Sequence, residues 1–367
     1  MRIPFRLHFQ HNLAVHRASS NLVVKLTSQE GISGYGEGVP RDFVTGESLA
    51  DSYQMLKEQL IPQIGNLQIT RKDEVWPAVS GLMEDSRQTA GPAACCALEL
   101  AILDWAGKTW QCSLSDFLPP PRYTPRYSAV LPLAAPDRQQ KLLDQVLRME
   151  IPHVKLKVGG TDDLAAVTRT RKTLGPHVDI RLDANGAWTA AEAVENITAL
   201  LPLGISAVEQ PVGKKDRAGL RAVTRQVPIP IIADESLCTR EDAARLTARQ
   251  ACTMFNIRIS KCGGLTAAMQ IYEHARRHGV QSQLGCHVGE TGILSAAGCH
   301  LAAALDFKYL EGAYGRLLLE RDIVHENVAF GPGGVPPKLP GWGLGVTVDD
   351  QILQQYARKH CRIPLNP

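Results

Sequence analysis

The chain has 367 residues, more than a single domain usually contains, so we expect one large domain and a second, smaller one. Apolar residues make up 44% and charged residues 21%, and 40 Lys and Arg nearly balance 37 Asp and Glu, for a formal charge of +3. This composition is typical of a soluble globular protein and argues against a nucleic-acid-binding surface, which usually carries a concentrated basic excess.

The first 125 residues predict a mixture of strands and helices. An alternating run over 21–27, turn residues at 29–31 and a glycine-rich segment over 34–38 predict a strand hairpin that leads into a loop. Apolar spacing predicts helices over 48–61 and 92–105, and the second is so apolar on all sides that it must be buried. Prolines then form a stiff break that we interpret as a domain boundary, at positions 119, 120, 121 and 125.

From Ser128 onward, short apolar runs alternate with helical stretches. We expect strands over 154–158, 180–183, 207–209, 229–234 and 254–259, and helices over 164–174, 190–201, 216–225 and 240–249. Two further apolar segments, 281–286 and 307–311, keep roughly the same step. Strands that alternate with helices of this length predict a parallel sheet with right-handed crossovers.

The polar residues that end these strands are evenly spaced. Lys157, Asp183, Glu209, Asp234 and Lys261 follow one another at intervals of 26, 26, 25 and 27 residues, so each stands at the same stage of its own strand–helix unit. In a closed barrel of parallel strands, these stages fall together on the carboxyl-end rim, where active sites lie. An open doubly wound sheet would spread them along a line, and no Gly-x-Gly-x-x-Gly follows a first strand.

Three acids, Asp183, Glu209 and Asp234, each close an apolar strand. Three carboxylates that converge on one rim would repel one another unless a cation neutralised them. Oxygen ligands without His or Cys favour magnesium or manganese over zinc. The alternative is three unrelated helix caps, which explains one such acid taken alone better than three in register. We therefore predict that these acids hold Mg²⁺ or Mn²⁺.

Lysines flank this set of acids. Lys155 and Lys157 are two residues apart, so they share one strand face and point into the barrel or toward its mouth. An ammonium that is buried near another ammonium and a divalent cation has a lowered pKa and can act as a base near neutral pH. Lys261 arrives from a strand four units later, across the barrel. Two bases on opposite sides of one carbon can move a proton from one face to the other, whereas exposed edge lysines are the alternative interpretation.

The motifs Lys155-x-Lys157, Asp183-x-Asn185, Glu209-Gln-Pro, Asp234-Glu and Lys261-x-Gly-Gly, in this order, resemble the muconate-lactonizing-enzyme subgroup of the enolase superfamily. The resemblance covers essentially the whole chain, including 34–38 and 97–108. It implies an α/β fold: a modified TIM barrel of the (β/α)7β type over 126–320, with an α+β capping domain formed by 1–125 and completed by 321–367.

The same resemblance implies roles for the residues of these motifs. Lys157 and Lys261 would form the acid/base pair, Lys155 would give electrostatic support, and the three acids would hold magnesium. The histidine–aspartate dyad of the mandelate-racemase subgroup is not expected, because Lys261 stands where that subgroup places its acidic partner. Such an enzyme removes a proton alpha to a carboxylate through an enediolate, which the metal and the nearby ammonium stabilise.

Three functions remain open at this stage. The first is racemisation or epimerisation of an amino-acid derivative or dipeptide. The second is a muconate-type cycloisomerase or an o-succinylbenzoate-synthase-type syn-dehydratase, which needs only one lysine as base. The third, from another class, is a catalytically silent relative that binds carboxylates.

Substrate choice is expected to depend on the capping loops and on the last strand ends. Residues 41–47 resemble the Thr-Gly-Glu segment of dipeptide epimerases, where Arg41 could pair with a second carboxylate or remain solvated. Those epimerases carry Asp-x-Asp after the eighth strand to hold the substrate ammonium, whereas 311–316 contain one acid, Glu311. This departure argues against ordinary Ala–Glu epimerase activity. Glu290 matches a family acid that orients a base or the substrate. We expect substrate contacts from Arg41, Thr45, Asn185, Glu235, Cys286, Glu290 and Glu311; for His287 a catalytic role and for Trp188 a place in the pocket wall stay open.

The cysteines and the chain start bear on the compartment. Nine cysteines, an odd number and never in Cys-x-x-Cys spacing, argue against a disulfide framework or a structural zinc site, and free thiols fit a reducing cytosol. We find no signal-peptide pattern and no run of about 20 apolar residues that would span a bilayer. We expect a cytoplasmic homo-oligomer that acts on a small-molecule carboxylate, without nucleic-acid or membrane partners.

Overall fold

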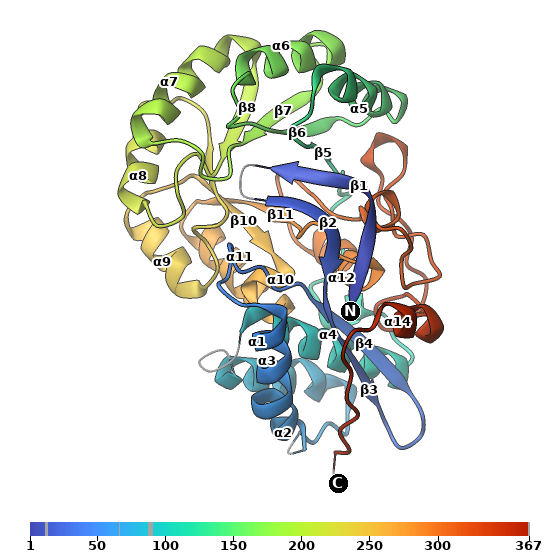
Figure 1. Ribbon diagram of the computed structural model, residues 1–367. Helices are drawn as coiled ribbons and strands as arrows, with labels where there is room; N and C mark the ends of the chain where they lie inside the picture. Colours follow the sequence, from blue (N-terminus) through green and yellow to red (C-terminus); the bar gives the residue numbers. More distant parts are fainter. Residues whose placement is uncertain (12–13, 66, 87–90, 366–367) are drawn as a thin grey trace.

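The computed structural model describes residues 1–367 except 12–13, 66, 87–90 and 366–367 (Figure 1). Its centre is a curled parallel sheet of seven strands in chain order, covered on the outside by helices. The strands are β5 (Ala129–Leu131), β6 (His153–Lys157), β7 (Asp179–Asp183), β8 (Ile205–Glu209), β9 (Ile231–Ala233), β10 (Met254–Arg258) and β11 (Gln281–Gly285). The helices between and after them are α5 (Pro136–Arg148), α6 (Asp163–Leu174), α7 (Ala190–Leu200), α8 (Arg217–Gln226), α9 (Arg240–Ala248), α10 (Ile259–Cys262), α11 (Leu265–Arg277) and α12 (Gly292–Ala304).

Isolated bridges close this sheet into a barrel. Leu310 pairs in parallel with Leu284 of β11 on one side and with Tyr127, just before β5, on the other. The strand predicted over 307–311 is therefore reduced to single bridges, and the backbone N–H groups of Lys308 and Glu311 donate to β11 carbonyls. The predicted modified TIM barrel is confirmed, and the other barrel strands and helices predicted from the sequence lie within two residues of their predicted ends.

A second, smaller part packs around the long helix α4 (Pro92–Thr109), which is buried as predicted. The hairpin β3 (Leu22–Thr27) and β4 (Ser33–Gly38) lies against it. The remaining elements of this part are β1 (Arg2–His11), β2 (Ala14–Ser20), α1 (Leu49–Met55), a π-helical turn (Leu56–Leu60), α2 (Ile61–Ile64), α3 (Val75–Ser86) and short 3-10 turns at Lys72–Glu74 and Leu114–Phe117.

The glycine-rich segment 34–38 corrects one prediction. It is not a loop after the hairpin but the hairpin's second strand, β4. A Cβ on Gly34, Gly36 or Gly38 would overlap backbone atoms of α4, so these alternate glycines let the strand lie directly on the helix. Close packing against a helix, which a local sequence pattern does not reveal, therefore explains the glycines.

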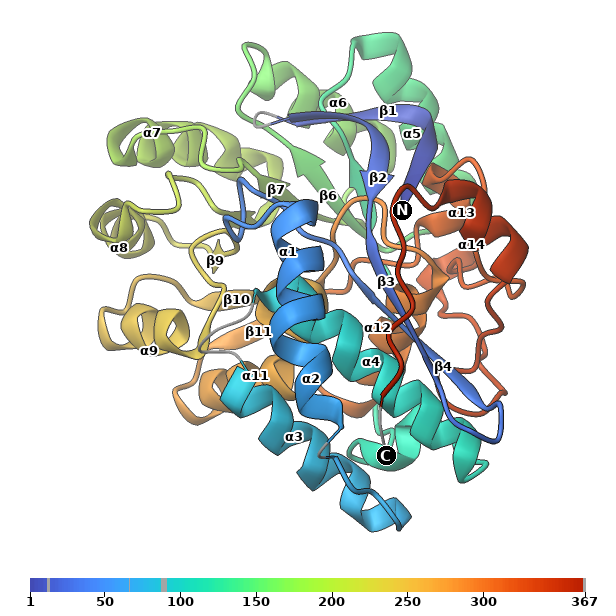
Figure 2. The ribbon, with the colours of Figure 1, turned by 60° about the horizontal axis from the view of Figure 1, so that its bottom comes forward.

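The end of the chain returns to this N-terminal part (Figure 2). Leu344 N–H donates to Asp104 of α4 at 2.9 Å, and Lys25 of β3 pairs with Asp350 at 2.6 Å. Beyond the barrel the chain forms α13 (Gly315–Leu318), a 3-10 turn (Pro332–Gly334) and α14 (Asp350–Tyr356). These contacts support our proposal that residues 1–125 and 321–367 form a single capping domain over a barrel of residues 126–320.

Two buried carboxylates of the capping part join it to the barrel. Glu37 of β4 accepts hydrogen bonds from Thr291 and from Leu294 N–H at the start of α12. Glu99 of α4 accepts from the N–H groups of Leu265 and Thr266 at the start of α11. The first N–H groups of a helix have no partner within it, so each carboxylate caps a barrel helix and fixes the capping part against it.

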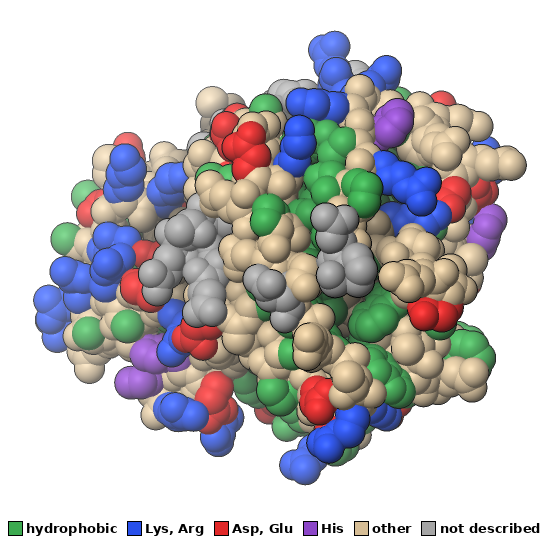
Figure 3. All heavy atoms as spheres, turned by 90° about the horizontal axis from the view of Figure 1, so that it is seen from below, with side chains coloured by type: hydrophobic (Ala, Val, Ile, Leu, Met, Phe, Trp, Pro, Cys, Tyr) green, Lys and Arg blue, Asp and Glu red, His purple; other side chains and the backbone are tan. Residues whose placement is uncertain are grey.

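The charged side chains on the capping face are mixed in sign (Figure 3). Among the described residues in that view, Lys and Arg lie interspersed with Asp and Glu rather than in one basic field, as the net charge of +3 leads one to expect. Within the described ranges, we also find no helix whose length and apolar character would let it cross a membrane.

Candidate active site

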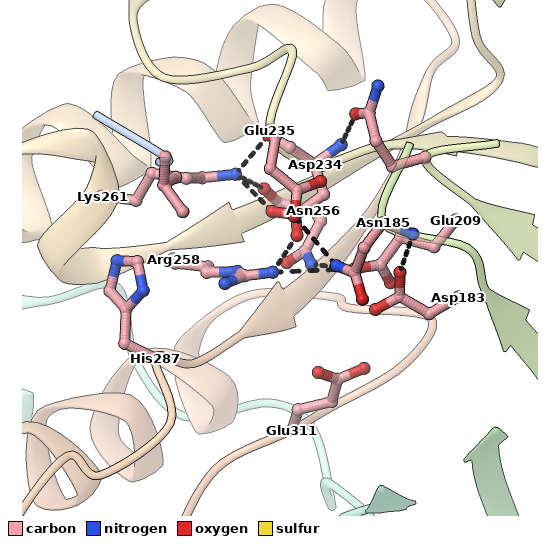
Figure 4. A network of polar contacts seen from close by, with 12 residues as sticks. Asp183, Asn185, Glu209, Asp234, Glu235, Asn256, Arg258, Lys261, His287 and Glu311 are labelled. Carbon is pink, nitrogen blue, oxygen red and sulfur yellow. Dashed lines mark hydrogen bonds and ion pairs between the residues drawn. The ribbon is translucent and has the colours of Figure 1, made fainter. Parts of the chain in front are cut away.

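The three predicted acids come together on one rim of the barrel (Figure 4). Asp183 and Glu209 are the last residues of β7 and β8 and stand directly opposite each other in the strand ladder, and Asp234 follows β9. All three side chains are fully buried. The even spacing in the sequence thus corresponds to neighbouring positions in space.

Lys155 and Lys157 share one face of β6, as predicted. The Lys157 Nζ lies 2.5 Å from Asp183 Oδ2 and 2.7 Å from Asn185 Oδ1. The Lys155 Nζ lies 3.1 Å from both Asp183 Oδ2 and Glu209 Oε1. Burial opposes the charge of Lys155, but the surrounding carboxylates outweigh it and raise its pKa. A permanent ammonium fits electrostatic support better than a base.

Lys261 lies on the far side of the network from Asp183 (Figure 4). It belongs to the short helix α10, which begins immediately after β10, so it follows this strand as the sequence spacing indicated. Its Nζ donates to Asp234 Oδ1, to the Asp234 carbonyl and to the Asn256 carbonyl, each at 2.8 Å. Burial lowers the pKa of the Lys261 ammonium, as a base requires.

Sequence reasoning missed Arg258, the last residue of β10. Its guanidinium contacts Asp234 Oδ2 and lies 3.8 Å from Glu209 Oε1. Two amides complete the surroundings of Glu209: Asn256 donates at 2.8 Å and Gln283 at 2.7 Å. Asn256 lies in the middle of β10, two residues before Arg258 and on the same strand face, and pairs in register with Gln283 in the middle of β11. Polar side chains at inward-facing positions of these strands were the signal that could have found them.

The donor set fits magnesium. Burial would raise the pKa of Asp183, but Lys157 and Lys155 hold it well below its usual range, so the carboxylate is ionised. Acceptor oxygens of Glu235, Asn256 and Gln283 are buried without a donor, which adds oxygen atoms suited to a hard cation. As the described side chains stand, no three acids, histidines or cysteines are gathered around one point, because each carboxylate turns toward a lysine or an arginine. Metal binding therefore requires these ion pairs to loosen.

Glu311 reaches the site but is already neutralised. Its Oε1 lies 2.5 Å from the Arg181 guanidinium, and its Oε2 lies 2.8 Å from Lys155 Nζ. Burial alone would raise its pKa, but the two cations hold the pKa at about 2. Arg181, which the sequence analysis also missed, is fully buried on β7, two residues before Asp183 and on the same strand face.

Of the two capping-loop residues predicted to contact the substrate, one lines the pocket and the other does not. Arg41 is buried and lines the pocket described below, and its guanidinium donates to the carbonyls of Pro40 and Val288 at 2.9 and 2.6 Å. Burial lowers the pKa of Arg41 to about 10. Thr45 is not among the described residues that line the pocket; its hydroxyl donates to the Arg41 carbonyl at 3.3 Å.

Of the residues singled out in the turn after β11, again only some line the pocket. Cys286 and His287 line the pocket, whereas Glu290 lies behind them and accepts from the His287 N–H at 2.6 Å. Burial raises the pKa of Glu290 to about 8. On the opposite side, Asn185 donates to Glu235 at 2.9 Å, and burial raises the pKa of Glu235. Trp188 bridges to Val212 and is not one of the described lining residues, so it packs against the barrel.

A pocket of about 340 Å³ opens among these side chains. That volume lies at the lower end of the roughly 300–1,000 Å³ typical of small-molecule sites, which suits a small substrate. Its polar part is lined by Lys155, Lys157, Asn185, Glu235, Arg258 and Glu311, together with Arg41, Cys286 and His287. The remainder is mostly apolar and is formed by β5, α5, α13 and the chain near Phe330.

Two family models match this chain. The model described as "Mandelate racemase / muconate lactonizing enzyme, N-terminal domain" matches residues 2–118, and the one described as "Enolase C-terminal domain-like" matches residues 139–352.

Individual relatives agree with these models. A hydrophobic dipeptide epimerase of Enterococcus faecalis is 33% identical over 307 residues, which cover 83% of this chain and 84% of the relative. The crystal structure of an N-succinyl Arg/Lys racemase from Bacillus cereus superposes with a TM-score of 0.88 at 26% identity, covering 98% of this chain and 96% of that one. A dipeptide epimerase from Enterococcus faecalis, solved with Mg and the dipeptide L-Leu-L-Tyr, superposes with a TM-score of 0.85 at 30% identity, covering 95% and 97%.

Proposed function

Since the chain belongs to the muconate-lactonizing-enzyme subgroup of the enolase superfamily and is an isomerase of that superfamily, we propose that it inverts the α-carbon of an N-acylated amino acid by two-base proton transfer. One observation carries the proposal: Lys157 ends β6, and Lys261 follows β10, four strands further around an eight-membered barrel. A carbon held between them would present one face to each lysine.

The proton transfer uses the two lysines in opposite states. A neutral Lys157 amine accepts the α-proton from one face, and the Lys261 ammonium returns a proton to the other; the opposite enantiomer reverses the roles. Lys261 is now held by Asp234, so this ion pair must open before the lysine reaches the substrate. Lys155, with its raised pKa, remains an ammonium and stabilises the negative charge that develops.

Asp183, Glu209 and Asp234 are the residues that would hold a magnesium ion, or a manganese ion in its place. When bound, the metal would act as a Lewis acid on the substrate carboxylate and lower the cost of forming the enediolate. The relative solved with Mg supports this assignment.

The charge balance of the pocket favours an amide nitrogen over a free ammonium. Its polar part is lined by the cations Arg41, Lys155, Lys157 and Arg258 but by only two acids among the described residues. One of these, Glu311, is engaged by two cations, so a substrate ammonium would find little counter-charge there. An acylated nitrogen carries no charge and avoids this repulsion, and the similarity to an N-succinyl amino-acid racemase points the same way.

Exchange in D2O tests the proposal. N-acetyl-L- and N-acetyl-D-amino acids should exchange the α-proton and invert. Lys157→Ala and Lys261→Ala should each lose racemisation by about 10²–10⁴-fold, and each should keep exchange from only one enantiomer, because one base remains. The matched control is Lys215→Ala, an exposed lysine on the loop before α8, which should behave as wild type.

Other outcomes would identify the alternatives. Net conversion of an unsaturated or hydroxylated carboxylate without inversion would assign a cycloisomerase or a syn-dehydratase, for which one lysine suffices. Neither exchange nor conversion across such a library would favour a silent carboxylate-binding protein.

We also propose that the protein acts in the cytoplasm as a homo-oligomer. The free state of all nine cysteines supports a reducing compartment. Size-exclusion chromatography with light scattering tests the oligomeric state, and a monomer mass would reject it.

A further inference from the structure

The pocket continues past the charged residues into an apolar arm. We define the apolar arm by Leu131 of β5, Leu142 and Val146 of α5, Met149 just after α5, Leu317 of α13, and Phe330. Each of these side chains lines the same pocket as Lys155 and Lys157, so the arm is continuous with the proposed site of proton transfer.

The strand register shows where this arm leaves the barrel. Val130 stands opposite Lys155 in the ladder and shares its inward face, so Leu131, one residue on, faces outward toward α5. Residues from both faces of β5 line the pocket, which therefore passes around this strand at its edge or its carboxyl end. The edge is open to such a passage because β5 has only three residues and its neighbour, the segment around Leu310, contributes single bridges.

The arm has the chemistry of a site for hydrocarbon. Its six defining side chains carry no charge, and the ionic groups of the pocket gather at the other end, around Lys155 and Glu311. One cation, Arg138 on the exposed side of α5, also touches the pocket wall. A concave apolar surface joined to a cluster of catalytic side chains is the usual form of a substrate subsite.

We propose that the apolar arm binds an aliphatic or aromatic chain carried by the substrate, so that the preferred substrate is an N-acyl amino acid with one large apolar substituent. This inference rests on the proposed function. This apolar substituent is either the acyl group or the side chain of the substrate, since both branch from the region of the α-carbon that would lie between the two lysines.

Two ligand series separate these sources. In the first, N-acylalanines carry acyl groups from acetyl to octanoyl; in the second, N-acetyl amino acids carry side chains from methyl to hexyl. In the series that enters the arm, kcat/KM in the D2O exchange assay should rise about fourfold for each methylene buried, until the arm is full. The other series should respond weakly. An N-succinyl substrate, with a carboxylate at the end of its acyl group, should fall below the butanoyl one.

A matched pair of variants places the effect in the arm. Leu142→Trp fills the arm with a larger apolar side chain and should abolish the gain from the long substituent, measured as the ratio of kcat/KM for the long substrate to kcat/KM for the short one. Leu147→Trp, on an exposed position of the same helix and not among the described lining residues, should keep the wild-type profile. A flat chain-length profile, a preference for succinyl, or a Leu142→Trp profile identical to wild type would overturn the proposal.

Calorimetric binding separates a failure of this inference from a failure of the proposed function. N-octanoylalanine and the hexyl-side-chain N-acetyl amino acid should each be titrated against their short homologues, with the magnesium-loaded enzyme and both variants. Tighter binding of a long ligand that Leu142→Trp removes supports the arm even if no substrate exchanges its proton. Equal binding of long and short ligands rejects the arm even if N-acetyl amino acids racemise.

Discussion

At the scale of single residues, the barrel interior depends on a cluster of three buried charges. Glu311 accepts from Arg181 on one oxygen and faces Lys155 with the other, and the Arg181 guanidinium also lies 4.5 Å from the ring centre of Tyr309. A buried ion that loses its partner costs far more than a pair of ions on the surface. The cluster therefore holds Lys155 beside the acids. Removing one of its members would lower the free energy of unfolding strongly.

A double-mutant cycle tests this cluster. Glu311→Gln and Arg181→Met should each lower the free energy of unfolding by about 3–5 kcal/mol, because each leaves buried charge unpaired. The double variant should be about 1–3 kcal/mol more stable than the sum of the single effects, measured by urea unfolding. Arg276→Met, whose Glu273 pair is exposed, should change stability by less than about 1 kcal/mol. Strictly additive effects would contradict the coupling.

Sequence analysis could predict the residues that end strands with a known chemical role, but not those whose role depends on depth inside the barrel. The two-residue spacing gave the shared face of Lys155 and Lys157, and the same rule applied to Arg181 would have turned it inward with Asp183. The neutralisation of Glu311 could not be predicted, because its partners come from β6 and β7, more than 100 residues earlier.

At the scale of elements, apolar runs and their spacing were enough to predict most of the barrel, because buried parallel strands are apolar on both faces. Two local patterns were misleading. The glycines of 34–38 indicated a loop, although close contact with α4 is the reason for them. The segment 307–311 indicated a strand, although its neighbours allow only single bridges. In both cases contacts distant in sequence decide the local structure.

Glycine substitutions test the contact between β4 and α4. Gly36→Ala should destabilise the protein by about 3 kcal/mol or more, because the new Cβ would overlap the Ala97 carbonyl and neither backbone can yield easily. Gly81→Ala is the control: this glycine is exposed within α3 with open space around its Cβ position, and alanine should stabilise the helix by about 0.5–1 kcal/mol. Thermal unfolding of both variants gives the comparison, and a Gly36→Ala variant as stable as wild type would contradict the packing.

At the scale of the whole molecule, the capping part and the barrel share their helix caps. Glu37 and Glu99 belong to the capping part, yet they satisfy the first N–H groups of α12 and α11 in the barrel. Unfolding of the capping part would leave these N–H groups without their acceptors, and unfolding of the barrel would leave the two carboxylates without their donors. We therefore expect the two parts to unfold in one cooperative transition. Until that transition, the loop that carries Arg41 should stay in place over the rim of the barrel.

Metal removal should affect both activity and stability of this assembly. Chelation should abolish proton exchange, and added Mg²⁺ should restore it. Because the ion binds the native state, Mg²⁺ at 100 times its Kd should add about 2.7 kcal/mol to the free energy of unfolding. Glu209→Gln should lose most of this increment, whereas Glu195→Gln, an exposed position on α7, should keep it. Activity that is indifferent to chelation would reject the metal assignment.

The return of the chain end to the capping part also has a consequence for synthesis on the ribosome. Lys25 meets Asp350, 325 residues later, and Asp104 meets Leu344, 240 residues later. At roughly 5–20 residues per second, β3 waits about 16–65 s for its last partner. During that time the apolar helix α4 has emerged without the barrel helices and tail that later cover it. We therefore expect the nascent N-terminal part to need protection from aggregation, and slow translation to prolong its exposure more than that of any barrel helix.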